Sequence, residues 1–280
     1  MEKIATYSQT NYLCNKYGLR AKKGYGQNFI IDYNIVDHIA RAACNEDDCV
    51  IEIGPGIGAL TQPLALRAKQ VYSFEIDQRC ITVLEESLKD LDNVKVIYHD
   101  FLEVDVQEIV DVLKKEYHHV KVASNLPYYI TTPLLFKLFE VDGLDAITVM
   151  MQKEVANRFV ALENTKDYNA LSVMAQYLFD VKFIMNVPAS TFNPKPKVDS
   201  AVIQFNPKNT RHPLQNPHAF FNFVRACFAQ RRKTLMNNIK NAKYDTDQVS
   251  QWLQKHELNQ NLRSEQLTLE QFIELYEWLN

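Results

Sequence analysis

Short apolar runs recur along the chain, and most of them stop at a glycine, an acidic residue or an asparagine. Helical spacing of apolar positions follows several of these runs. Such an alternation predicts buried strands connected by helices, which is typical of an α/β sheet whose strands are mostly parallel. We expect strands at residues 49–53, 71–74, 94–98, 120–124 and 146–151, and helices at residues 59–68, 152–162 and 171–178.

Two later runs predict how this sheet is completed. Residues 181–187 and 198–205 are separated by a proline-rich loop, which favours a closing antiparallel pair at one edge. The result would be a Rossmann-like seven-stranded mixed sheet with helices on both faces. Beyond Pro207 the pattern is wholly helical, and Pro213 and Pro217 mark a linker. We therefore expect two domains, residues 1–207 and a small all-helical domain at residues 208–280.

A glycine loop follows the first predicted strand, in the stretch Glu52-Ile53-Gly54-Pro55-Gly56-Ile57-Gly58. Glycines let backbone N–H groups approach a ligand closely. An acidic residue about twenty positions later, Glu75, is placed to bind ribose hydroxyls, and Asp100 after the third strand can accept an adenine amino group. The Gly-x-Gly-x-Gly spacing departs from the dinucleotide fingerprint. Three such strand ends in register point to S-adenosylmethionine.

The tetrapeptide Asn125-Leu126-Pro127-Tyr128 ends the strand at residues 120–124. Taken alone, it is also compatible with a simple strand-ending turn. An adenine amine is a poor nucleophile, and two acceptors, the Asn125 side-chain oxygen and the Leu126 carbonyl, would favour the tetrahedral geometry that alkylation needs. Pro127 would fix the carbonyl, and Tyr128 would offer a stacking face. No strong general base is then required.

Five motifs, taken together, resemble the KsgA family of small-subunit rRNA adenine dimethyltransferases. They stand in that family's order and span about residues 20 to 240. They are Gly26-Gln27-Asn28-Phe29, the glycine loop, Asn125-Leu126-Pro127-Tyr128, residues 192–200 beginning at Phe192, and residues 228–235 containing Gln230-Arg231-Arg232-Lys233.

The resemblance implies a class I S-adenosylmethionine-dependent methyltransferase that makes N6,N6-dimethyladenosine at two adjacent adenosines near the 3′ end of 16S rRNA, within the 30S subunit or its precursor. A role in subunit maturation is also implied. By motif position, Asn125, Leu126, Tyr128 and Phe192 would hold the target base, with Phe192 stacking opposite Tyr128. The residues implied to bind S-adenosylmethionine are Asn28, Ile30, Gly54, Glu75, Asp100 and Asn125.

Two departures from the family pattern are visible. Asn164, Thr165 and Asn169 replace a usual Pro-Gly pair and a glycine around Lys166-Asp167-Tyr168, which we interpret as loop variation. Tyr129 stands where many members carry asparagine, which concerns only the rim of the pocket.

Composition indicates a cytoplasmic protein without a metal centre. With 280 residues and 46% hydrophobic content, the chain can bury a large core. No secretory pattern or bilayer-length apolar run is evident, so we expect no membrane contact. The five cysteines form no Cys-x-x-Cys pair and the seven histidines no ligand spacing, so we expect no metal. His118 and His119 are expected in a loop. Lacking a heptad pattern, the protein is expected to be a monomer.

A net charge of −3 is unusual for a protein that binds naked RNA. The distribution is more informative, because residues 207–244 contain no Asp or Glu. Their basic residues, interleaved with phenylalanines, predict an amphipathic helix that shows phosphates a basic side. Three basic clusters are expected around one cleft. They are Lys208, Arg211, Arg225, Arg231, Arg232, Lys233, Lys240 and Lys243; Arg20, Lys22 and Lys23; and Lys195 and Lys197.

Two other functions remain open. An Erm-like enzyme shares the cofactor motifs but methylates one adenine of 23S rRNA and confers macrolide resistance; residues 196–200 and 228–233 and the acidic balance count against it. An assembly-checkpoint protein that binds the subunit, with catalysis secondary, is compatible with every residue named above.

Overall fold

The computed structural model describes residues 2–20 and 27–280. Its strands are β1 (Phe29–Ile30), β2 (Asp48–Ile53), β3 (Gln70–Glu75), β4 (Val94–Tyr98), β5 (His119–Asn125), β6 (Ala146–Gln152), β7 (Phe179–Val187), β8 (Phe192–Asn193) and β9 (Ser200–Pro207). Its α-helices are α1 (Tyr7–Lys16), α2 (Tyr33–Ala43), α3 (Thr61–Ala65), α4 (Gln78–Ser87), α5 (Val106–Leu113), α6 (Thr131–Phe139), α7 (Lys153–Val160), α8 (Ala170–Leu178), α9 (Pro217–Cys227), α10 (Leu235–Asn241), α11 (Thr246–Lys255) and α12 (Leu269–Trp278). Short 3₁₀ helices occupy Phe101–Glu103, Ala189–Thr191 and Ser264–Gln266.

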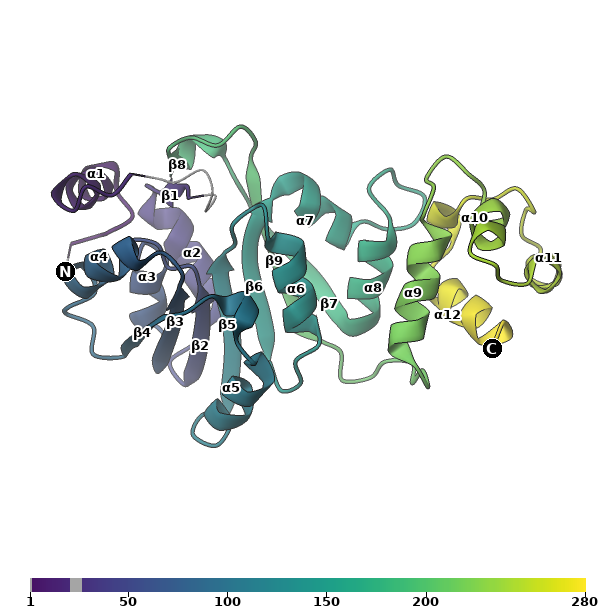
Figure 1. Ribbon diagram of the computed structural model, residues 1–280, viewed down its shortest axis with the longest axis horizontal. Helices are drawn as coiled ribbons and strands as arrows, with labels where there is room; N and C mark the ends of the chain where they lie inside the picture. The colour runs from purple at the N-terminus through teal and green to yellow at the C-terminus, as the bar shows by residue number, and fades with distance from the viewer. Residues whose placement is uncertain (1, 21–26) are drawn as a thin grey trace. The chain divides into compact units, whose positions relative to one another are not determined.

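The chain divides into two compact units (Figure 1). The first comprises Met1–Ala156 and Lys182–Pro207, and the second comprises Asn157–Val181 and Lys208–Asn280. The expected boundary near residue 207 coincides with the end of the first unit. The segment Asn157–Val181, expected in the first domain, lies instead with the second unit, because α8 packs against α9 and α12.

The main sheet has seven strands in the order β4-β3-β2-β5-β6-β9-β7. The first five are mutually parallel, and β9 runs antiparallel to β6. The predicted mixed sheet, with its two late strands as neighbours at one edge, is therefore confirmed. Strand order reverses between β2 and β5, so right-handed crossovers place α3 and α4 on one face and α6 on the other (Figure 1).

Local sequence explains most of the element boundaries. Every residue of β2 is buried, as its apolar run predicts, and β4 occupies the expected residues. The predicted helix at residues 59–68 is shorter, because backbone turns continue to Leu60 and α3 covers only Thr61–Ala65. His119, expected in a loop, opens β5, where its partner in the parallel pairing is Asp48.

A separate two-stranded ribbon was not predicted. In it β1 pairs antiparallel with β8, so that Ile30 lies opposite Phe192 and Phe29 opposite Asn193. Two residues on each side are too few for a periodic signal in the sequence. The ribbon brings the segment before α2 to the loop that precedes β9.

Candidate functional site

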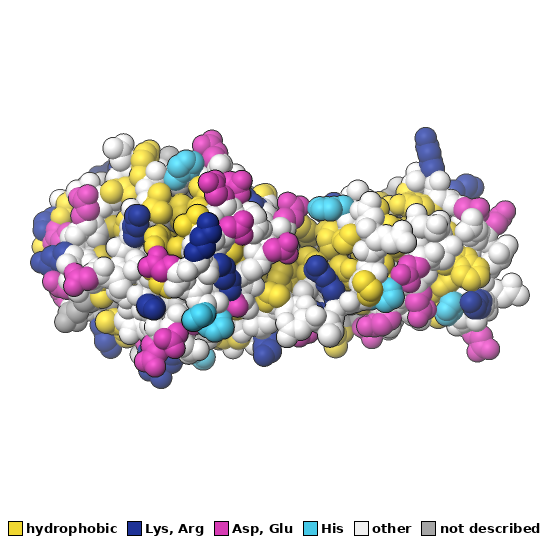
Figure 2. Space-filling model, turned by 90° about the horizontal axis from the view of Figure 1, so that it is seen from below, with side chains coloured by type: hydrophobic (Ala, Val, Ile, Leu, Met, Phe, Trp, Pro, Cys, Tyr) yellow, Lys and Arg dark blue, Asp and Glu magenta, His cyan; other side chains and the backbone are white. Residues whose placement is uncertain are grey.

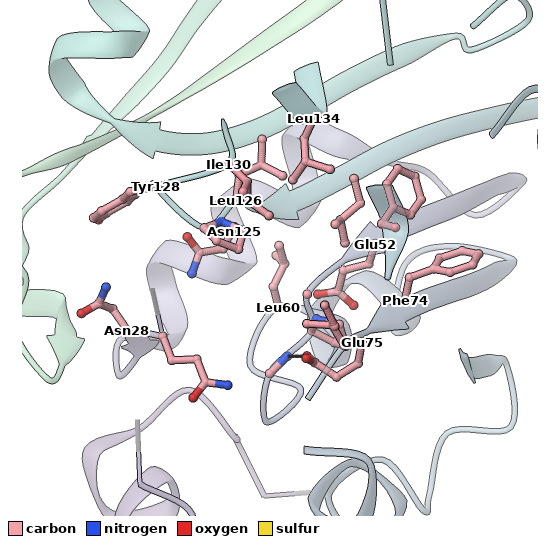
Figure 3. Close-up of a pocket in the computed structure, with 18 of the residues that line it drawn as sticks. Asn28, Glu52, Leu60, Phe74, Glu75, Asn125, Leu126, Tyr128, Ile130 and Leu134 are labelled. Carbon is pink, nitrogen blue, oxygen red and sulfur yellow. Dashed lines mark hydrogen bonds between the residues drawn. The ribbon is translucent and has the colours of Figure 1, made fainter. Parts of the chain in front are cut away.

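A pocket of about 230 Å³ lies at the carboxyl ends of β2, β3 and β5 (Figure 3). This is the point at which strand order reverses, where open α/β sheets bind ligands. The pocket lies wholly within the first unit. All nine predicted site residues line it: Asn28, Ile30, Gly54, Glu75, Asp100, Asn125, Leu126, Tyr128 and Phe192.

The glycine loop turns tightly against the end of β3. Gly54 and Gly56 have φ of 67° and 61°, a left-handed conformation that side chains disfavour. A Cβ on Gly56 would also stand 3.4 Å from the Phe29 ring. The Gly54 N–H donates to the Phe74 carbonyl at 2.8 Å. Glycine at these positions therefore keeps the loop backbone next to the pocket.

Glu75, the last residue of β3, is held by backbone N–H groups. Its Oε2 accepts from Gly56 N at 2.9 Å, and its Oε1 accepts from Asp77 N at 2.8 Å. Burial raises the pKa of Glu75, and these hydrogen bonds oppose that effect. The Asp77 side chain in turn accepts from Gln27 Nε2 at 3.0 Å, which connects Glu75 to the segment that carries Asn28. Because both carboxylate oxygens of Glu75 are held in place, they can accept hydrogen bonds from two neighbouring hydroxyl groups of a ligand.

Asp100 follows β4 and begins the 3₁₀ helix Phe101–Glu103. Its Oδ1 accepts from Leu102 N at 2.9 Å. The side chain therefore stays at the wall of the pocket, where the sequence places it.

Glu52 also lines the pocket, although the sequence suggested no role for it beyond its place in the glycine motif. Its side chain is buried, and Ser73 Oγ donates to its Oε2 at 2.8 Å. Burial raises the pKa of Glu52 to about 7, and the charge of Glu75 acts in the same direction. The available signal was an acid set among apolar residues in the second half of a buried strand.

Asn125 is the last residue of β5. The N–H of Leu126, the next residue, still donates to the Met150 carbonyl at 3.1 Å. The Pro127 carbonyl is occupied, since Ile130 N and Thr131 Oγ1 both donate to it. Within residues 2–20 and 27–280, no hydrogen bond reaches the Asn125 side chain. Its carboxamide is therefore available to a ligand, as Figure 3 shows.

Aromatic groups flank this end of the pocket. The Tyr128 hydroxyl lies 2.6 Å from Ser200 Oγ, which fixes the ring, and burial raises the pKa of Tyr128. Phe192, on β8, is buried and packs in the main apolar cluster of the first unit. Both rings contribute to the pocket wall.

The basic segment differs from the prediction of one amphipathic helix. Helix α9 carries Arg225, while residues 231–233 occupy an exposed turn between α9 and α10. Asn238, buried in α10, stabilises this turn: its Oδ1 accepts from Gln230 N at 3.1 Å and its Nδ2 donates to Cys227 O at 2.7 Å. The turn lies in the second unit. Gly26, Lys22 and Lys23 lie outside the described residues, and the expected convergence of three basic clusters stays a prediction.

Lys195 and Lys197 are exposed in the loop between β8 and β9. On the face shown in Figure 2, basic and acidic side chains are interspersed. No group of three His, Cys, Asp or Glu side chains suited to a metal ion occurs in the described parts of the chain. Nor does any helix among those residues have the length and apolar character needed to span a bilayer.

Residues 18–280 match the family model described as ribosomal RNA adenine dimethylase. The ribosomal RNA small subunit methyltransferase A of Bacillus licheniformis is 46% identical over 276 residues, covering 96% of this chain and 94% of that protein. The protein of the same name from Leuconostoc mesenteroides is 44% identical over 280 residues, covering 98% and 95%.

Two solved structures are similar over most of their length. The 23S rRNA methyltransferase ErmE matches with a TM-score of 0.70 and 28% identity over 90% of this chain and 99% of that one. A dimethyladenosine transferase from Plasmodium falciparum matches with a TM-score of 0.71 and 28% identity over 88% and 95%. The class I methyltransferase fold with an added helical part is thereby confirmed.

Proposed function

Because the chain belongs to the ribosomal RNA adenine dimethylase family and is therefore an rRNA methyltransferase, we propose that it dimethylates N6 of two adjacent adenosines near the 3′ end of 16S rRNA in the small subunit. One observation carries the proposal. The Asn125 carboxamide, which has no partner in the described structure, faces the same pocket as the Glu75 carboxylate and the glycine loop. The group that would accept the adenine amine therefore lies next to the site that would bind the methyl donor.

The pocket fits S-adenosylmethionine as the methyl donor. Glu75 offers two oriented carboxylate oxygens for the ribose hydroxyls, and Asp100 offers an acceptor for the adenine amine. Asn28, Ile30 and Gly54 would complete this part of the site. When bound, the donor supplies an electrophilic methyl group on a positively charged sulfur.

The residues at the other end of the pocket would orient the target base. The Asn125 Oδ1 and the Leu126 carbonyl accept the two N–H bonds of the adenine amine, which directs its lone pair toward the methyl group. Tyr128 and Phe192 contact the two faces of the base. The methylated nitrogen is briefly a cation and releases its proton to water, so the site needs no strong general base.

The second unit supplies the rRNA-binding surface in this proposal, and the first unit supplies catalysis. Arg231, Arg232 and Lys233 stand together in an exposed turn that a buried amide stabilises, as phosphate contacts require. Lys195 and Lys197 are exposed on the loop that ends next to Ser200 and Tyr128. The enzyme would act as a monomer in the cytoplasm, without a metal, on the 30S subunit or its precursor.

Large-subunit methylation is the second candidate, because ErmE shares the fold over 90% of this chain. Relatives named for the small subunit are far more similar in sequence, at 46% and 44% identity. We therefore favour the small subunit. A checkpoint role in assembly would act through the same rRNA-binding surface.

The decisive experiment measures methyl transfer from labelled S-adenosylmethionine to small subunits from a strain that lacks the modification. Large subunits and free rRNA are assayed in parallel, and the modified bases are mapped. Dimethyladenosine at two neighbouring positions near the 3′ end of 16S rRNA is expected. Label confined to 23S rRNA would overturn the small-subunit assignment, and tight binding without transfer would favour an assembly factor.

The variant Asn125→Ala tests the amine acceptor. We expect transfer to fall by about 100-fold or more, as for loss of an oriented transition-state hydrogen bond, while the subunit remains bound. The control is Gln152→Ala, since Gln152 lies at the end of the neighbouring strand and does not line the pocket. Wild-type rates in Asn125→Ala would show that the acceptor is misassigned.

A further inference from the structure

The pocket carries an unbalanced negative charge. Among the described residues that line it are Glu52, Glu75 and Asp100, and none is Lys or Arg. Glu75 and Asp100 are each stabilised by backbone N–H donors. Glu52 accepts a hydrogen bond from the Ser73 hydroxyl, the nearby Thr61 hydroxyl also acts to lower its pKa, and no salt bridge in the described structure reaches it. Glu52 is therefore the least compensated charge of the three.

Burial makes this imbalance costly. Glu52 is 1% exposed, and a buried carboxylate without a paired cation is strongly disfavoured relative to its protonated form. The raised pKa, about 7, reflects that cost. A cation bound in the same pocket would interact favourably with the ionised form and offset part of the cost. In Figure 3 the Glu52 carboxylate points toward the space between Leu60 and Glu75, two residues that also line the pocket.

The methyl donor and the demethylated product, which bind in turn to a methyltransferase pocket, differ in the charge on their sulfur atom. S-Adenosylmethionine carries a positive sulfonium, whereas the demethylated product, S-adenosylhomocysteine, has a neutral thioether and is otherwise identical. Resting on the proposed function, we propose that Glu52 makes the pocket favour the sulfonium donor over the neutral product. This role is distinct from the ribose and adenine contacts assigned to Glu75 and Asp100, since both ligands share those groups.

The charge balance of the reaction gives this preference a consequence. The bond from sulfur to the methyl carbon breaks as the bond from nitrogen to that carbon forms, and the sulfur keeps the electron pair. The positive charge leaves the pocket with the proton that the amine releases. Glu52 then faces a neutral thioether in place of the sulfonium, which weakens product binding. Dimethylation of two adenosines takes four transfers, so four products must leave.

Three ligands and two variants test the proposal by calorimetric titration. The ligands are S-adenosylmethionine, S-adenosylhomocysteine and sinefungin, in which a carbon bearing an ammonium group replaces the methylated sulfur. In Glu52→Gln we expect the dissociation constants of the two cationic ligands to rise about tenfold, which corresponds to about 1.4 kcal/mol, and that of S-adenosylhomocysteine to change less than about twofold. The matched control Glu75→Gln should weaken all three ligands alike, because all three carry the ribose.

A measurement on the wild-type protein stands even if Glu52→Gln fails to fold. The ratio of affinities for S-adenosylmethionine and S-adenosylhomocysteine is followed from pH 5.5 to 8.5, since the amino and carboxyl groups common to both cancel in the ratio. Glu75, Asp100 and His99 are the other acid and imidazole groups at the pocket, and they remain in the Gln variant. We expect the ratio to rise as Glu52 ionises and to be flatter in Glu52→Gln.

Two results would overturn the role of Glu52: equal losses of both ligands in Glu52→Gln, or a wild-type ratio that does not change with pH. If the wild-type protein binds none of the three ligands, the proposed function itself fails, and this inference with it. The two failures are therefore distinguishable in one series of titrations.

Discussion

The replacement Phe192→Leu separates base stacking from packing. Phe192 is 3% exposed and belongs to the apolar cluster of the first unit, so removing the whole ring would leave a cavity as well as an empty stacking face. Burial of this kind makes Phe→Ala cost about 3–5 kcal/mol of folding stability. Leucine keeps most of the buried volume and removes the aromatic face, so it isolates the effect on the substrate.

The expected size follows from the interaction that is lost. Stacking of a base on an aromatic side chain contributes about 1–3 kcal/mol. If Phe192 stacks on the target base, kcat/KM for methyl transfer to small subunits should fall by about 5- to 150-fold in Phe192→Leu. The dissociation constant for S-adenosylmethionine should change less than about twofold, because the donor has its own contacts at Glu75 and Asp100.

The assay combines single-turnover methyl transfer with calorimetric titration of the donor and a thermal melt. Phe205→Leu is the matched control, since Phe205 is a fully buried phenylalanine of the same unit that does not line the pocket. It should lose comparable stability and keep wild-type transfer. A wild-type kcat/KM in Phe192→Leu would refute the stacking role, and a parallel loss of donor affinity would assign Phe192 to the donor site instead.

Three further predictions concern stability and rRNA binding. Folding raises the pKa of Glu52 from 4.5 to about 7, so its contribution to stability is present below about pH 4.5 and lost as pH rises through 7. Between pH 4.5 and pH 8.5, the free energy of unfolding of Glu52→Gln, measured by urea denaturation, should therefore gain about 3 kcal/mol relative to that of the wild type. Parallel pH profiles of the two proteins would contradict this. Asn238→Ala removes the bonds to Gln230 and Cys227, so it should lower stability by about 2–3 kcal/mol and weaken subunit binding while donor affinity is unchanged. Arg232→Ala should weaken subunit binding and reduce the slope of log affinity against log salt by about 1, and an unchanged slope would remove this residue from the phosphate contacts.

Several features of this protein were determined by local sequence. The apolar runs predicted β2, β4 and β6 to within a residue or two. The central strands β2 and β6 are buried almost throughout, which requires mostly apolar residues. The sequence also predicted the glycine loop, since a left-handed turn selects glycine. It predicted the acids at the ends of β3 and β4 as well, because strand ends in a parallel sheet converge on one edge. The nine predicted site residues therefore share one pocket.

Other features depend on contacts between distant parts of the chain. The segment Asn157–Val181 has the helical pattern of its neighbours, and only the packing of α8 on α9 and α12 places it in the second unit. The pairing of Ile30 with Phe192 involves strands of two residues, which are too short to leave a periodic signal. The surroundings of Glu52 were likewise hidden. Its pKa is set by burial, by the Thr61 hydroxyl, and by Ser73 and Glu75 on a neighbouring strand. Periodicity records which face of an element is buried, whereas the energy of a buried charge depends on which groups the fold brings beside it.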